Sequence, residues 1–301
     1  MEAILAGLNI EQLPQDEWLR WHYDKEKMSA SRAAGAMGFG RFSSPLQEYA
    51  ELRGDIDRPD TTLAMQLGHL LEPTVATLYE AETGRITVDP GEYAIIRHPD
   101  FPWLFATLDR LTSNAEKIIG PLELKTTNSF LRSEWADGAP VAPQIQCTVQ
   151  MMCAELTWGS IACLIGNSDF LTHDFLLDTD LAESILKSLD QFHTDVLAGN
   201  EPDATWQDGA VIKALHPNDN GRTIVSTDPH IVGLIAEYEA LNAQSKQVEK
   251  NKDTAKFKLQ SVIGDNTFLE CTGVKYSFKS QTRKAYEVKE NTFRVLRKVK
   301  M

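Results

Sequence analysis

A change in hydrophobic period is the feature of this sequence that most limits its fold. Up to Gly84 the apolar residues recur with helical spacing, and from Glu92 to Asp178 they largely alternate, as in strands. The helical patterns cover 14–27, 28–38, 43–54 and 61–84. The strand patterns cover 92–98, 103–109, 120–127, 159–166 and 169–178. The chain therefore contains a helical segment followed by a sheet-forming segment.

Two further helices interrupt and follow the strand series. One covers 141–157, between the third and fourth strands, and the other covers 179–199, after the fifth. This order predicts an α/β core in which a central mixed β-sheet is flanked by helices.

The pattern weakens near Gly199 and a different kind of segment begins. A turn-rich connector leads to a long charged helix at 228–262 and a hairpin-like tail at 272–300. The apolar positions of this helix, from Ile231 to Leu241, span too few heptads to predict a coiled coil. We therefore expect one domain at 1–200 and a C-terminal extension at 201–301.

Composition excludes several classes of protein. No apolar run approaches the roughly 20 residues that span a bilayer, and no basic, apolar leader is visible. The four cysteines are few for the length and have no C-x-x-C spacing, which argues against a zinc or iron–sulfur site. We expect a reduced, cytoplasmic protein that does not enter a membrane.

The charge is unevenly distributed. The formal net charge is −13, which by itself argues against a polyanionic partner. From Ser245 to Met301, however, 14 Lys and Arg residues stand against 6 Asp and Glu residues. This basic end of an acidic chain could bind DNA or contact a partner, or it could be a solvated surface.

The strand "LELKTTN" at 122–128 places Glu123 and Lys125 on one face, because side chains alternate along a strand. The two residues are either an exposed ion pair, worth under about 1 kcal/mol, or half of a metal site. A hairpin of strands 103–109 and 120–127 would bring Asp109 close to Glu123. These carboxylates and the backbone carbonyl of Leu124 would suit Mg²⁺, or Mn²⁺ as a substitute.

The other members of such a site follow from its chemistry. A metal would polarise a phosphate, and Lys125 would orient and help to deprotonate an attacking water. Glu72, on the helix at 61–84, is a third carboxylate that could reach the same metal. His69, one turn before it, is either an extra ligand or an ordinary surface histidine.

This set of residues resembles the PD-(D/E)XK nuclease superfamily, whose core is restriction-endonuclease-like. The motifs are Gly68-x-x-x-Glu72, Asp109, Glu123-x-Lys125 and a following helix that carries glutamine. Within the superfamily, the chain is most similar to the lambda exonuclease or YqaJ-type viral recombinase family. That family's helix has the form P-x-x-Y-x-x-Q-x-Q. Here Gln146 matches its first glutamine and Thr148 replaces the second, while Gln150 lies one turn beyond Gln146.

The resemblance also implies residues that bind DNA. The family's serine for the 5′ phosphate falls on Ser31, and its arginine has no clean match; Arg20, Lys25 and Lys27 are candidates. Thr126 and Gln150 complete the expected DNA-binding set.

The resemblance implies a Mg²⁺-dependent exonuclease of phage or prophage origin that acts in the host cytoplasm. It would digest one strand of duplex DNA from the 5′ end and leave 3′ overhangs for a single-strand annealing protein. A ring-shaped homo-oligomer, such as a trimer, would thread the DNA.

Two alternatives remain open. One is a non-catalytic DNA-binding protein on a nuclease fold. The other is a RecB-like or CRISPR-adaptation nuclease of the same superfamily that lacks an iron–sulfur cluster.

Overall fold

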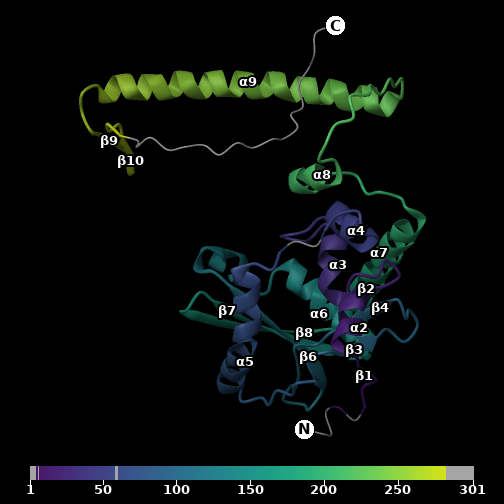
Figure 1. The fold of residues 1–301 in the computed structure, drawn as a ribbon. Helices are drawn as coiled ribbons and strands as arrows, with labels where there is room; N and C mark the ends of the chain where they lie inside the picture. The colour runs from purple at the N-terminus through teal and green to yellow at the C-terminus, as the bar shows by residue number, and fades with distance from the viewer. Residues whose placement is uncertain (1–4, 6, 58–59, 283–301) are drawn as a thin grey trace. The chain divides into compact units, whose positions relative to one another are not determined.

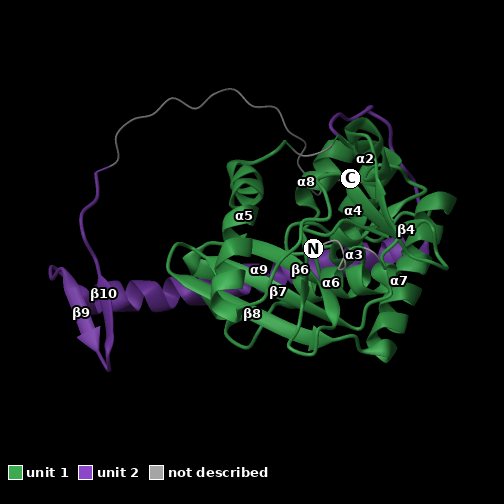
Figure 2. Cartoon of the chain, turned by 90° about the horizontal axis from the view of Figure 1, so that it is seen from below, with its two compact units in different colours: residues 1–216 green, residues 217–301 purple. Residues whose placement is uncertain are grey.

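The computed structural model describes residues 5, 7–57 and 60–282 (Figure 1). The chain divides into two compact units, Met1–His216 and Pro217–Met301 (Figure 2). Among the described residues, no helix is both long enough and apolar enough to span a bilayer.

Helices dominate the start of the first unit, as the period predicts. They are α2 (Gln15–Trp21), α3 (Ala30–Ala36), α4 (Pro45–Arg53) and α5 (Leu63–Thr83). The Ser44 hydroxyl caps α4 by accepting from the N–H of Gln47 at 3.0 Å, and Pro45 takes the first helical position. Gly54 and Gly84 end α4 and α5 in the left-handed conformation.

The strands of this unit form two four-stranded mixed sheets within the described residues. The first has the order β1 (Ile10–Gln12), β3 (Ala94–Arg97), β4 (Leu104–Ala106), β2 (Met28–Ser29). The second has the order β5 (Arg110–Ser113), β6 (Ile119–Thr127), β7 (Trp158–Ile165), β8 (Asp169–Leu176). In the second sheet only β6 and β7 run parallel.

Helices cover both faces of the second sheet. Val75, Ala76 and Tyr79 of α5 pack against Leu122 and Leu124 on one face of β6. On the other face, α6 (Val141–Ala154) packs over β6 and β7, following the 3₁₀ helix η1 (Ser129–Trp135). The helix α7 (Thr179–Ala198) follows β8 and closes the main core with Ile185, Leu189 and Val196. The predicted α/β class, with mixed sheets flanked by helices, is confirmed.

Two predicted boundaries are wrong. The predicted strand at 103–109 ends at Ala106, because β4 joins the first sheet while β5, which starts at Arg110, joins the second. The predicted helix at 28–38 begins instead with the short strand β2, which pairs parallel with β4. A two-residue strand is too short to produce a detectable alternation.

The connector after Gly199 contains a helix that belongs to the first unit. This helix, α8 (Gly209–Leu215), packs through Val211 and Leu215 against Leu46 and Ala50 of α4. The compact unit consequently extends to His216, beyond the end at residue 200 that composition suggested.

In its described part, residues 217–282, the second unit consists of one long helix and a hairpin. The helix α9 spans Pro229–Ile263, and β9 (Phe268–Cys271) pairs antiparallel with β10 (Val274–Ser277). Thr272 and Gly273 make the turn with positive φ angles of 48° and 80°. The hairpin thus starts before the predicted tail at 272–300, and residues 283–301 lie outside the described part.

Candidate active site

The β5–β6 hairpin brings Asp109 and Glu123 together. Arg110 of β5 pairs with Leu122 of β6 in an antiparallel register, so Asp109 and Glu123 are the next residues along the two strands. The backbone N–H of Leu124 donates to Asp109 Oδ2 at 2.8 Å. The predicted adjacency is confirmed, although Asp109 precedes β5 instead of ending β4.

Glu123 is buried and both of its carboxylate oxygens have partners. Its side chain is 1% exposed, its Oε1 forms an ion pair with Lys125, and its Oε2 accepts from Gln150 Nε2 at 2.5 Å. The same Nε2 donates to the Thr107 carbonyl at 3.2 Å. Gln150 therefore fixes the orientation of Glu123 and ties β6 to the segment that leads to Asp109.

Lys125 lies between this cluster and solvent. Its side chain is 33% exposed, and its Nζ donates to Gln146 Oε1 at 3.1 Å as well as contacting Glu123. Gln146 and Gln150 lie one turn apart on α6, so one helix face positions both charged residues. The ion pair considered from the sequence is present, and it lies inside a larger group of carboxylates.

The electrostatics of the cluster show an excess of negative charge. Burial and the neighbouring Glu123 raise the pKa of Asp109 well above its usual value, against the opposing effect of Lys125. Burial opposes the charged form of Lys125, but Glu123 and Asp109 outweigh it and raise the pKa of this amine. Lys125 therefore keeps its proton at neutral pH.

Glu72 lies on α5, the helix on the opposite face of the sheet, and interacts electrostatically with Glu123 and Asp109. Burial raises the pKa of Glu72, with partial compensation from His69 and Arg110 and a further rise from Glu123. His69 Nδ1 lies 3.1 Å from Glu72 Oε1 and its side chain is 81% exposed. His69 thus contacts the predicted carboxylate; a role as a ligand stays a prediction.

The residues fit a divalent cation in number and chemistry, with one restriction. In the described part of the chain, no group of three or more His, Cys, Asp or Glu side chains is placed to hold a metal ion. Mg²⁺, however, is commonly held by one or two carboxylates with waters and substrate phosphates. Asp109 and Glu123, with the Leu124 carbonyl, match that requirement, and a cation would neutralise their repulsion. A ligand role for Glu72 stays a prediction.

Comparison with known proteins finds a family model that matches the part of the chain holding this site. Residues 17–157, which contain Glu72, Asp109, Glu123, Lys125 and both site glutamines, match the YqaJ-like viral recombinase domain. This stretch of the chain is similar to the YqaJ-like viral recombinase domain.

One curated protein and two solved structures are also similar to this chain. The protein YqaJ of Bacillus subtilis is 27% identical over 197 residues, which are 64% of this chain and 59% of that protein. The match thus spans less than two thirds of the relative's length. Two crystal structures of an alkaline exonuclease from Laribacter hongkongensis, one with dAMP, share the fold with TM-scores of 0.50 and 0.51 at 24% identity. They cover 62% and 66% of this chain, and 94% and 99% of their own.

Of the predicted DNA-binding residues, Gln150 is buried against Glu123, and the other four occupy two places in the first unit. Ser31 is exposed on the first turn of α3, where its Oγ lies 2.9 Å from that of Ser29. Arg20 and Lys25 are exposed on the nearby α2 and the turn after it. Thr126 lies on β6 under α5, with its Oγ1 near Gly68. DNA binding by these residues stays a prediction.

Sequence reasoning missed Arg32, the basic residue next to Ser31. Arg32 is buried and donates to Glu48, to Glu51 at 3.1 Å and to the His22 carbonyl at 3.1 Å. With its charge paired in this way, Arg32 ties α3 to α4.

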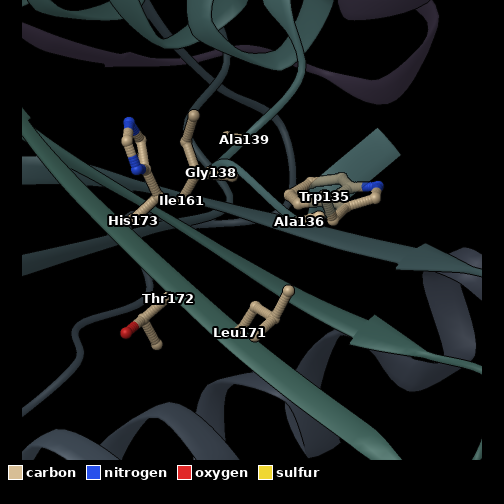
Figure 3. A pocket seen from close by; sticks show the side chains of 8 residues that line it. All are labelled: Trp135, Ala136, Gly138, Ala139, Ile161, Leu171, Thr172 and His173. Atoms are coloured by element: carbon tan, nitrogen blue, oxygen red, sulfur yellow. The ribbon is translucent and has the colours of Figure 1, made fainter. Parts of the chain in front are cut away.

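A separate cavity of about 210 Å³ lies between the η1–α6 connection and β8 (Figure 3). The ring of His173 lies against Gly138, where an added Cβ would be 3.0 Å from the ring. The cavity is lined by Trp135, Ala136, Gly138, Ala139, Ile161, Leu171, Thr172 and His173. None of the clustered carboxylates lines it, so it is distinct from the candidate active site.

Proposed function

We propose that this chain is a metal-dependent exonuclease that acts on linear double-stranded DNA. The observation that carries the proposal is the cluster of Asp109, Glu123 and Lys125 at the β5–β6 hairpin, in the stretch similar to the YqaJ-like domain. The fold shared with an alkaline exonuclease gives further support.

Mg²⁺, with Mn²⁺ as a substitute, is the proposed cofactor. Asp109, Glu123 and the Leu124 carbonyl would hold it, with Glu72 assisting from α5. When bound, the cation would polarise the scissile phosphate and lower the pKa of an attacking water.

The remaining residues would position the reacting groups. Lys125 is protonated, so it would donate a hydrogen bond to the water or to a phosphate oxygen and stabilise charge that develops there. This assignment refines the expected role of Lys125 as an aid to deprotonation. Gln146 would hold the Lys125 ammonium in place, and Gln150 would hold the Glu123 carboxylate.

The finer features of the proposal follow from the family resemblance. Digestion would run from the 5′ end, and the 3′ overhang would serve a single-strand annealing protein in phage-type recombination. Ser31, with Arg20 or Lys25, would bind the 5′ phosphate. A ring-shaped homo-oligomer, such as a trimer, would keep the enzyme on its DNA.

The test uses linear duplex DNA labelled at the 5′ or the 3′ end, with Mg²⁺ or with a chelator. We expect Mg²⁺-dependent release of 5′-labelled nucleotides and a loss of about 10²–10⁴-fold in Lys125→Ala. Lys187→Ala, at an exposed position on α7, is the matched control and retains full activity.

Three other results would each contradict the proposal or part of it. DNA binding without cleavage in Mg²⁺ or Mn²⁺ would indicate the non-catalytic alternative. Internal cuts would indicate a RecB-like nuclease. Full activity of Lys125→Ala would remove Lys125 from the mechanism.

A further inference from the structure

Within the described part of the second unit, the long helix α9 has almost no packing partner. It spans 35 residues, from the cap residue Asp228, whose side chain accepts from the His230 N–H at 2.8 Å, to Ile263. Ile263 is the only one of its residues that the described structure buries. Helices in proteins owe most of their stability to a packed apolar face, so α9 requires a surface that covers one.

An apolar seam runs along the whole helix. We define the seam as the positions reached from Ile231 by alternating steps of three and four residues up to Val262. These ten positions carry apolar or aromatic side chains except at Ser245 and Lys252, so the seam continues well beyond Leu241. This spacing is that of the a and d positions of a coiled coil.

Within the described part of the second unit, most of the seam is open to solvent. Leu234, Leu241 and Val248 are 51%, 55% and 64% exposed. A continuous apolar stripe of this kind marks a contact with another protein surface.

Charge along α9 indicates which surface it contacts. The acidic residues Glu237 and Glu239 lie in the first half, whereas the last half carries four lysines, from Lys250 to Lys258, against Glu249 and Asp253. A parallel pair of these helices would place Lys252 against its own copy in the seam. An antiparallel pair would instead bring acidic halves against basic halves.

The antiparallel register also matches the polar positions of the seam. Ile231 then lies opposite Val262, and Ser245 opposite Val248. Lys252 lies opposite Leu241, where its aliphatic stem covers the leucine and its ammonium reaches solvent. Beside the seam, Glu237 lies opposite Lys258. In this arrangement the two helices complement each other in apolar contacts and in charge. The partner that fits is therefore a second copy of this chain.

We propose that α9 forms an antiparallel two-stranded coiled coil with α9 of a second copy of this chain. The proposal rests on the seam and on the charges of the second unit, and it is independent of the nuclease function.

Oxidative cross-linking of the full chain tests the direction of pairing. The background is Cys271→Ser, because Cys271 is the exposed cysteine and the other three are buried. In an antiparallel pair, Leu234 neighbours Leu259 of the other copy and lies roughly 38 Å from its own copy. We expect the double variant Leu234→Cys/Leu259→Cys to form a cross-linked dimer and each single variant to form none. A dimer from Leu234→Cys alone would show parallel pairing and overturn the proposal.

The mass of the full chain in solution tests whether the seam mediates association. We expect Leu241→Lys/Val248→Lys to halve the mass of the assembly. The matched control Ala243→Lys/Gln247→Lys, on the outer face of α9, retains the wild-type mass. Circular dichroism shows whether α9 stays helical in each variant.

Charge reversal provides a variant that leaves the seam intact. Glu237→Lys alone shifts dissociation to at least several-fold higher protein concentration, and adding Lys258→Glu restores the wild-type value. A wild-type mass that the seam variant leaves unchanged, or no cross-link in the double variant, would show that something else covers the seam and would overturn the proposal.

Discussion

The groups around the Glu123 carboxylate compensate its charge but leave the neighbouring carboxylate of Asp109 without compensation. Lys125 and Gln150 engage its two oxygens, and this satisfies the buried charge within the protein. Asp109 nevertheless lies beside it with a raised pKa, so the pair Glu123–Lys125 leaves one carboxylate uncompensated. This repulsion costs stability in the absence of a ligand, and a bound cation would relieve it.

Asp109→Asn tests this repulsion in the absence of divalent metal. The asparagine side chain can still accept from the Leu124 N–H, but it carries no charge. The pKa of Asp109 is higher in the folded protein than in the unfolded chain, so the fold loses stability when this carboxyl ionises. The loss is present at pH 8 and disappears below the usual carboxyl pKa. We expect Asp109→Asn to stabilise the fold by on the order of 1 kcal/mol, or roughly 2–4 °C in melting temperature. Asp137→Asn, at an exposed position, should leave it unchanged; a lower melting temperature in Asp109→Asn would contradict the account.

The two site glutamines should differ in their effect on stability. Gln150→Ala leaves the buried Glu123 oxygen and the Thr107 carbonyl without their donor, which costs about 1–3 kcal/mol of unfolding free energy. Gln146→Ala removes a half-exposed contact and should change stability by less than about 0.5 kcal/mol. Denaturant unfolding measures both, and hydrolysis should fall in both. Equal stability of the two variants would remove the structural role of Gln150.

At the scale of single residues, the sequence predicts which side chains share a face of a strand better than it predicts which side chains of different elements touch. Alternation along β6 places Glu123 and Lys125 on one face, and the hairpin register adds Asp109, because both follow from backbone geometry. The contact of Gln150 with Glu123 depends on how far α6 lies from β6, which spacing along one helix does not determine. The pairing of Arg32 with Glu48 and Glu51 depends likewise on the packing of two helices.

At the scale of elements, the alternating patterns predict every long strand of the second sheet. They do not predict that the strands divide into two sheets. Thr107 and Leu108 leave β4 and lead into β5 without glycine or proline to mark the change. This short gap places Asp109 directly before β5, where the chain enters the second sheet, and beside the middle of β6. The helix α8 is missed because its seven residues lie within a turn-rich composition.

One ion pair joins the end of α5 to β8. Arg85 donates to Asp174 at 2.9 and 2.6 Å, and the Ser160 hydroxyl donates to Asp174 at 2.7 Å. Burial alone would raise the pKa of Asp174, but these hydrogen bonds outweigh it and hold the pKa below its usual value.

Asp174→Asn should therefore destabilise the fold in a pH-dependent way. Since the folded-state pKa is lowered, the stabilisation is present above the unfolded pKa of about 4 and is lost as pH falls below it. We expect a cost of about 1 kcal/mol at pH 7, because the pair is partly exposed, and none near pH 2. Asp169→Asn on the same strand, which removes an exposed pair with Arg132, is the control. A cost that does not change with pH would contradict the assignment.

On the scale of the whole molecule, the YqaJ-like match lies within the first unit, and α8 completes that unit. A chain ending at His216 should fold with a midpoint within about 3 °C of the midpoint for this unit in the full chain. A chain ending at Asn200 lacks Val211 and Leu215, exposes Leu46 and Ala50, and should lose about 2–4 kcal/mol. Thermal unfolding measures both, and equal midpoints would place the boundary before α8.

The central claim is that Asp109 and Glu123 together bind a divalent cation. Calorimetric titration of Mg²⁺ and Mn²⁺ into the 301-residue chain, without DNA, measures this binding directly. We predict saturable binding to the wild-type protein that Asp109→Asn and Glu123→Gln each abolish and that Asp137→Asn leaves intact. Unchanged cation binding by Asp109→Asn and Glu123→Gln, or no binding by the wild-type protein, would contradict the claim.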